Sequence, residues 1–211
     1  FVHHSSDGMR MKNTFYLLLF WLGLSLEVPA QAIWSADFPF AGELPSNEMT
    51  ELYQDEDGFV WIGTTNGLSR YDGYRLQTFQ TDYLHPNRLT HNHITCIAED
   101  SAYLWIGTRK GLNLIDKRTY RITTPGEAPL QTAHIRSLCS DGKSRIWIAL
   151  NDRLLESHFP YHEYTSINLP SPNGKPSYIN SFFYEKGKER LWICTSNGVF
   201  VYTDLSLIHI S

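Results

Sequence analysis

Histidine pairs are the residues of this chain whose type and spacing could bind a metal ion. His91 and His93 form an H-x-H pair in a polar loop, and His158 and His162 have the i, i+4 spacing of two ligands on a helix. A zinc site needs further ligands in a fixed geometry, and none accompanies either pair in the sequence. Pro160 also removes the helix that would align the second pair. The sequence therefore predicts loop histidines, with no metal site and no cofactor.

Acidic residues recur at one position of several repeated segments, where a catalytic carboxylate could stand. Asp55, Asp57, Asp100 and Asp141 each follow an apolar stretch and belong to a short turn. Because Asp side chains bind nearby backbone N–H groups, this recurrence favours turn formation over catalysis. The chain has no G-x-S-x-G, no H-E-x-x-H and no Gly-rich phosphate loop. We predict no catalytic residue and no enzyme activity for the residues present.

A repeated five-residue motif must position all of these groups. It reads VWIGT at residues 60–64, LWIGT at 104–108, IWIAL at 146–150 and LWICT at 191–195. Its tryptophans, Trp61, Trp105, Trp147 and Trp192, are spaced 44, 42 and 45 residues apart. Self-similarity at such a period is the signature of a repeat architecture. The tryptophans themselves are expected in the core.

The residues around each motif predict four short strands per repeat. The fourth motif position is always small, with Gly63, Gly107, Ala149 and Cys194, which indicates close packing against a neighbour. The motif is followed in three repeats by a turn ending in Gly67, Gly111 or Gly198, where glycine can take the positive φ of a tight hairpin. We predict an all-β fold, a β-propeller of about four blades of four antiparallel strands in a partial ring. A β-sandwich does not require one Trp motif in every unit.

Composition sets limits on compartment and partners. The net charge of −4 and the absence of a basic patch disfavour nucleic acid as a partner. The three cysteines, Cys96, Cys139 and Cys194, lie in apolar strand segments of different repeats, so we expect buried thiols and no disulfide.

The chain divides into five segments. Residues 1–10 carry no structural signal and look like non-native upstream sequence. Residues 11–32 have the basic start, apolar run and small-residue cleavage site of a secretory signal peptide. Residues 33–46 could supply a ring-closing strand, and residues 47–204 hold the four repeats, the last incomplete. Residues 205–211, LSLIHIS, resemble a translated sequencing adapter, so the chain looks like a truncated fragment.

One face of the propeller is expected to carry the ligand site. In a four-strand blade, the loop between blades and the turn between the second and third strands open on the same face, and binding groups concentrate on such loops. The candidates with polar or aromatic side chains suited to sugars are Tyr83, His85, Arg88, His91, Arg109 and Arg153.

Residues 42–79 resemble the two-component regulator propeller repeat, with an acidic-Gly turn, W-I-G-T, an Asn-Gly turn and L-x-R-Y-D-G, and the resemblance extends over residues 43–204. The second repeat matches well and the third and fourth in part. This resemblance implies the periplasmic part of a Bacteroidetes hybrid two-component histidine kinase that detects glycan breakdown products. The resemblance also implies a homodimer, an oligosaccharide ligand, and a downstream membrane helix with kinase and phosphorelay domains. The alternatives are a secreted propeller lyase or glycosidase, and a protein-binding scaffold.

Overall fold

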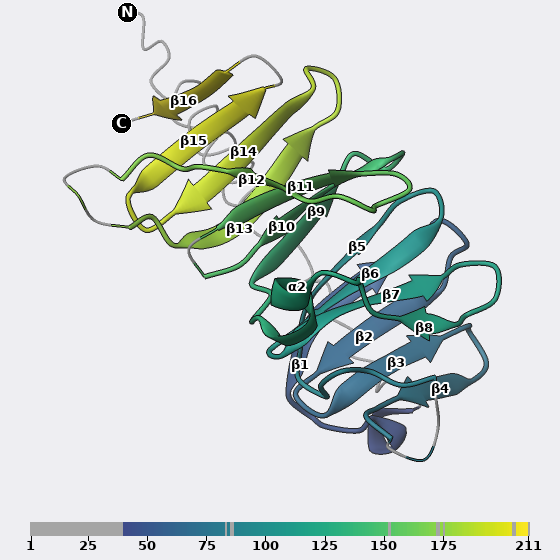
Figure 1. The fold of residues 1–211 in the computed structure, drawn as a ribbon. Coiled ribbons are helices and arrows are strands. Elements are labelled where there is room, and N and C mark those ends of the chain that lie inside the picture. The colour runs from purple at the N-terminus through teal and green to yellow at the C-terminus, as the bar shows by residue number, and fades with distance from the viewer. Residues whose placement is uncertain are drawn as a thin grey trace, which may run out of the picture. The chain divides into compact units, whose positions relative to one another are not determined.

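The computed structural model describes residues 40–82, 84, 87–151, 153–171, 174, 176–203 and 206–210. These residues belong to one compact unit, Pro39–Ser211. They form four sheets, and each sheet has four antiparallel strands that are hydrogen-bonded in chain order (Figure 1). The predicted all-β propeller architecture of four-stranded blades is therefore confirmed.

The strands are short and follow the predicted repeats. The first sheet contains β1 (Met49–Gln54), β2 (Val60–Thr64), β3 (Gly67–Tyr71) and β4 (Leu76–Phe79). The second contains β5 (Ile94–Glu99), β6 (Tyr103–Thr108), β7 (Gly111–Asp116) and β8 (Ile122–Thr123). The third contains β9 (Ser137–Ser140), β10 (Arg145–Ala149), β11 (Leu154–His158) and β12 (Thr165–Ile167). The fourth contains β13 (Ile179–Glu185), β14 (Arg190–Thr195), β15 (Gly198–Thr203) and β16 (Ser206–Ile210).

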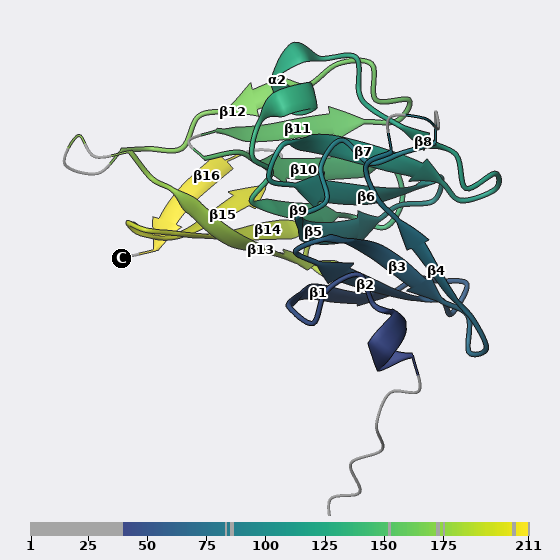
Figure 2. The same ribbon diagram turned by 90° about the horizontal axis from the view of Figure 1, so that it is seen from below.

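Successive sheets contact each other through their first strands. β1 contacts β5, β5 contacts β9 and β9 contacts β13 (Figure 2). The second strand of every sheet carries the Trp motif. A short helix, α2 (Ala128–Thr132), lies in the connection between the second and third sheets and contacts β7.

The core consists of three apolar layers, one between each pair of neighbouring sheets. Trp61 belongs to the layer between the first and second sheets, Trp105 to the next and Trp147 to the third. These three indoles are at most 1% exposed. Because each sheet buries side chains on a partner sheet, the apolar area removed from water, and not strand pairing alone, holds the blades together.

The small residue of the motif makes room for the next sheet. A Cβ at Gly63 would lie 2.8 Å from the Cγ2 atom of Ile94, and one at Gly107 would lie 2.9 Å from that of Ile135. Both isoleucines are fully buried and stand at or just before the first strand of the next sheet. The predicted close packing is confirmed at these two positions.

One cysteine departs from the expectation of buried thiols. Cys96 is buried and Cys139 is partly buried, but Cys194 is exposed, and all three thiols are free. Cys194 takes the position of Gly63 and Gly107 in the fourth sheet. Phe183 of β13 and Ile208 of β16 in the same sheet are also exposed. Among the described residues, no further sheet covers this face, so the expectation of a buried thiol was wrong for Cys194.

The Thr of the motif and the following glycine build the hairpin turn together. The Thr64 hydroxyl donates to the Gly67 carbonyl at 2.9 Å and accepts from the Asn66 N–H at 3.1 Å. Thr108 with Gly111 and Thr195 with Gly198 repeat the first contact. The glycines have φ of +144°, +105° and +120° in chain order, as the sequence predicted.

The recurrent acidic residue fixes both a turn and the motif tryptophan. Asp55 Oδ1 accepts from the Phe59 N–H and its Oδ2 accepts from the Trp61 Nε1–H at 2.7 Å. Asp100 and Trp105 repeat this bond at 2.5 Å, and Glu185 and Trp192 at 3.1 Å. The predicted turn role is confirmed for Asp55 and Asp100, and the bond to the indole is an additional role.

The third sheet lacks this bond. Asp141 Oδ1 accepts from the Lys143, Ser144 and Arg145 N–H groups, whereas Trp147 Nε1 is buried without a hydrogen-bond partner in the described part of the chain. The Arg145 guanidinium lies 4.9 Å from the centre of the Trp147 ring instead. The sequence divergence of the third repeat is thus accompanied by a different polar network.

Only some of the predictions for the chain ends concern residues that the structure describes. The upstream segment and the signal peptide lie outside the described residues, as do residues 33–39 of the proposed closing strand. Residues 40–46 contain a 3₁₀ turn, Ala41–Glu43, and no strand. Residues 206–210 of the suspected adapter tail form β16 and pair with β15. None of the helices in the described segments is long and apolar enough to cross a bilayer.

Candidate functional site

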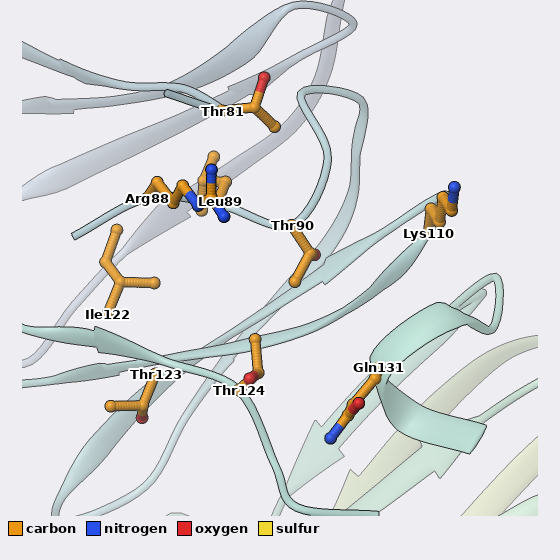
Figure 3. A pocket seen from close by; sticks show the side chains of 9 residues that line it. All are labelled: Thr81, Arg88, Leu89, Thr90, Lys110, Ile122, Thr123, Thr124 and Gln131. Atoms are coloured by element: carbon orange, nitrogen blue, oxygen red, sulfur yellow. The ribbon is translucent and has the colours of Figure 1, made fainter. Parts of the chain in front are cut away.

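A cavity of about 420 Å³ opens beside the second sheet, where three connecting segments meet. Its lining residues come from the loop between the first two sheets, the β6–β7 turn, the end of β8 and helix α2 (Figure 3). They are Thr81, Arg88, Leu89, Thr90, Lys110, Ile122, Thr123, Thr124 and Gln131. The volume is within the range of sites for small ligands.

Two asparagines fix the inter-sheet loop on the second sheet. Asn87 accepts from the Ile122 N–H at 2.5 Å and donates to the Tyr120 carbonyl at 3.3 Å. The fully buried Asn113 accepts from the Thr90 N–H and donates to the Thr90 hydroxyl, both at 3.0 Å. Hydrogen bonds at both ends of residues 87–90 hold Arg88 and Leu89 against the cavity.

The opposite wall depends on a glycine. Gly111 has φ +105°, and its N–H donates to the Ala133 carbonyl at 2.8 Å. A Cβ at this position would lie 2.5 Å from the Gln131 carbonyl oxygen and 3.0 Å from Thr90 Oγ1. Only a residue without a Cβ therefore lets the turn that carries Lys110 pass this close to α2 and to the loop.

The lining groups are polar and cationic. Thr81, Thr123 and Thr124 supply hydroxyls, and Gln131 supplies an amide whose nitrogen donates to the Pro125 and Gly126 carbonyls. Arg88 and Lys110 supply positive charge, and no carboxylate from the described part of the chain lines the cavity. Leu89 and Ile122 form an apolar floor of two buried side chains. The arrangement can bind a molecule that has both hydroxyl groups and an apolar face.

The structure brings some of the sequence candidates together and separates others. Arg88 lines the cavity, and Arg109 precedes the lining residue Lys110 in the same turn. His91 Nδ1 accepts from the His93 N–H at 3.0 Å and lies outside the cavity.

The remaining candidates cannot be assigned to the cavity. Arg153 lies in the β10–β11 turn of the third sheet and does not line it. Tyr83 and His85 lie outside the described residues.

Sequence reasoning missed the threonines and Gln131. Thr81, Thr90 and Thr124 are loop residues and Thr123 ends β8, and none of the four has a distinctive spacing in the sequence. Their only signal was position, because Thr81 and Thr90 flank the predicted candidates in the same loop. α2 was not predicted, so nothing in the sequence pointed to Gln131.

A second group of cations and histidines stands next to the first strands. The Arg109 N–H donates to the His93 carbonyl at 3.1 Å. Desolvation lowers the pKa of His93, and Arg109, His91 and His134 lower it further. Desolvation also lowers the pKa of His134, assisted by Arg136 and Arg109. Both imidazoles therefore favour the neutral form in a positive environment.

Carboxylates gather elsewhere, in a cavity of about 340 Å³ lined partly by Asp141, Glu156 and His158. Glu156 Oε2 accepts from the Tyr202 hydroxyl at 3.0 Å, and Oε1 lies 3.6 Å from Arg145 Nη1. Asp141 accepts hydrogen bonds from the backbone N–H groups of its own turn. These acids have structural partners, and no group of three or more His, Cys, Asp or Glu side chains in the described segments could hold a metal ion.

Comparisons with known proteins relate the chain to sensor propellers. The profile of the two component regulator propeller family matches residues 43–66 and 88–110. No curated protein matches the chain significantly in sequence.

Two solved structures are extracellular domains of putative hybrid two component systems from B. thetaiotaomicron. The first is 25% identical over 78% of this chain and 21% of that chain, with a TM-score of 0.62. The second is 21% identical over 80% of this chain and 25% of that chain, also with a TM-score of 0.62. This chain thus spans a quarter or less of each sensor domain.

Propellers of other function share the fold. Virginiamycin B lyase from Staphylococcus aureus is 14% identical over 77% of this chain and 56% of that chain, with a TM-score of 0.57. At that identity the likeness concerns the fold alone. The two profile matches, the four sheets and the sensor-domain structures agree: the chain is a β-propeller whose first two repeats match the two component regulator propeller family.

Proposed function

We propose that this chain is part of the extracytoplasmic, ligand-sensing propeller of a two-component sensor histidine kinase. The observation that carries the proposal is the match to two component regulator propeller repeats, together with the likeness to extracellular domains of hybrid two component systems. The proposed location is the periplasm, after export by the predicted signal peptide. The kinase and its membrane helix would belong to other parts of a longer protein.

The proposed ligand is an oligosaccharide released by glycan breakdown. The cavity beside the second sheet supports this choice, because threonine hydroxyls and an amide stand above an apolar floor formed by Leu89 and Ile122. Sugars present hydroxyls at their edges and C–H groups on their faces, so this mixture suits them. In the longer protein, a homodimer would transmit the signal if its two arrangements bind the ligand with different affinities.

Calorimetric titration of the chain with defined oligosaccharides tests the proposal. We expect binding of at least one saccharide, and we expect the substitution Thr124→Val to weaken that binding by removing a lining hydroxyl. The matched control is Thr165→Val, on β12 of the third sheet and outside the cavity. Failure of every saccharide to bind, or cleavage of a saccharide during the titration, would contradict the sensor proposal; cleavage would favour a lyase or glycosidase.

A further inference from the structure

The charge of the cavity restricts the class of saccharide that it can take. Arg88 and Lys110 line it, and among the described residues neither Asp nor Glu does; Arg88 Nη1 also donates to the Asp82 carbonyl at 3.2 Å. The Lys110 ammonium has no ion-pair partner in the described segments. The cavity with Asp141 and Glu156 differs, since there Arg145 faces both carboxylates.

A further positive charge stands in the same turn as Lys110. Arg109 adjoins Lys110 in sequence, and it contributes to the lowered pKa values of His93 and His134. A positive charge that depresses the pKa of two nearby imidazoles also attracts an anion toward this face. Arg88, Arg109 and Lys110 thus supply positive charge from two segments, while Glu48 acts on His93 with the opposite sign.

The hydroxyls of the cavity complete the set of donors. In the described part of the chain, the Thr81, Thr123 and Thr124 hydroxyls have no hydrogen-bond partner. Each hydroxyl can donate one bond and accept others, so together they suit a ligand with alternating hydroxyl and carboxylate or sulfate oxygens. Charge-assisted bonds from Lys and Arg to such oxygens are stronger than bonds between neutral groups.

We propose that this cavity binds an acidic saccharide, one that carries a carboxylate or sulfate group contacted by Lys110 and Arg88. This inference rests on the proposed sensor function and names the ligand class of the same site. A neutral saccharide would leave Lys110 partly desolvated without a compensating anion, which costs binding energy.

Matched ligand pairs test the inference by calorimetry. The first pair is trigalacturonate and its methyl ester, which share their rings and differ in charge. The second pair is a galactose disaccharide with and without one sulfate. We expect the acidic member of at least one pair to bind about tenfold more tightly than its neutral partner, and the difference to shrink at 0.5 M salt because salt screens charges. The pair that responds distinguishes carboxylate from sulfate as the recognised group.

Variants locate the effect. Lys110→Gln should weaken binding of the acidic ligand about tenfold and should not weaken binding of its neutral partner, because a neutral ligand gains no charge-assisted bond from Lys110. Arg153→Gln, an exposed arginine in the equivalent turn of the third sheet, is the control and should change neither. Because Lys110 is exposed and its side chain makes no contact that the fold needs, the variant is expected to fold.

Each outcome decides between the two proposals. Equal binding of acidic and neutral partners would overturn the acidic-ligand inference and leave the sensor proposal standing. Tight acidic binding that Lys110→Gln does not alter would also overturn it, by placing the anion elsewhere. Absence of binding by all four ligands overturns the inference, whereas the sensor proposal fails only if the wider saccharide titration is negative as well.

Discussion

Removal of the Asp100 carboxylate should destabilise the chain far more than removal of Asp141, although both follow the first strand of their sheets. Asp100 is fully buried. Its Oδ2 accepts from the Trp105 Nε1–H at 2.5 Å and from the Tyr161 hydroxyl at 2.7 Å. Its Oδ1 accepts from the Ala102 and Tyr103 N–H groups. It therefore joins the second sheet to Tyr161, in the segment that follows β11 of the third.

The magnitude follows from the donors that lose their acceptor. In Asp100→Ala, the Trp105 N–H and the Tyr161 O–H would remain buried and unpaired, at a cost of about 1–3 kcal/mol each. The two turn N–H groups should add about 1 kcal/mol, because water can replace part of their bonding. We expect the free energy of unfolding to fall by about 3–7 kcal/mol, a large part of a typical domain's stability.

Asp141→Ala is the matched control within the same molecule. Asp141 Oδ1 accepts from three backbone N–H groups of its turn, its Oδ2 lies 4.0 Å from Arg145 Nε, and the Trp147 N–H does not bind it. We expect a loss of about 1 kcal/mol, the usual effect of removing a capping side chain.

Urea unfolding followed by circular dichroism measures both losses. If Asp100→Ala does not fold, Asp100→Asn replaces it, and its loss should still exceed that of Asp141→Asn. Similar losses at the two positions would refute the reasoning, because they would show that the bonds to the indole and to Tyr161 contribute nothing.

Three further predictions concern the thiols, the glycine turn and the histidines. Iodoacetamide should modify Cys194 quickly, while Cys96, buried and with a pKa raised to about 12 by desolvation, should react only after unfolding; mass spectrometry distinguishes the two. Gly111→Ala should lower stability by more than 1 kcal/mol in urea unfolding and weaken saccharide binding, because the turn must move away from α2. Arg109→Gln should raise the pKa of His134 measured by NMR, since Arg109 contributes to lowering it from 6.5.

The lowered pKa of His134 should also make the stability of the chain depend on pH. The folded-state pKa of His134 lies below 6.5, so between these two values the unfolded chain binds more protons than the folded chain. The free energy of unfolding should therefore decrease as the pH falls through 6.5 toward the folded-state pKa.

Controls keep these predictions specific. Gly126→Ala should be nearly neutral, because no atom lies within 4 Å of the added Cβ. Arg153→Gln should leave the pKa of His134 unchanged. Rapid labelling of Cys96 in the folded chain, or an unchanged His134 pKa in Arg109→Gln, would contradict the respective arguments.

The repeat architecture could be predicted from the sequence because its causes are local. An apolar motif around each tryptophan, a small residue two positions later and a turn glycine determine strand, packing face and hairpin within about ten residues. Gly63 and Gly107 illustrate this: their register alone indicated a close neighbour, which proved to be an isoleucine of the next sheet. The hydrogen bond between Asp55 and Trp61 could also have been predicted from the sequence, since an acidic residue precedes each motif tryptophan at nearly constant spacing.

The cavity and the exposure of individual residues were decided only by the tertiary structure. Residues 81, 110 and 131 are far apart in the chain and meet because neighbouring sheets and α2 bring their connections to one place. Cys194 and Gly107 share a motif position, yet one is exposed and the other packs against the next sheet. The physical reason is that hydrogen bonds within a blade depend on nearby residues, whereas the covering of a motif position and the meeting of loops depend on segments that are far apart in the chain.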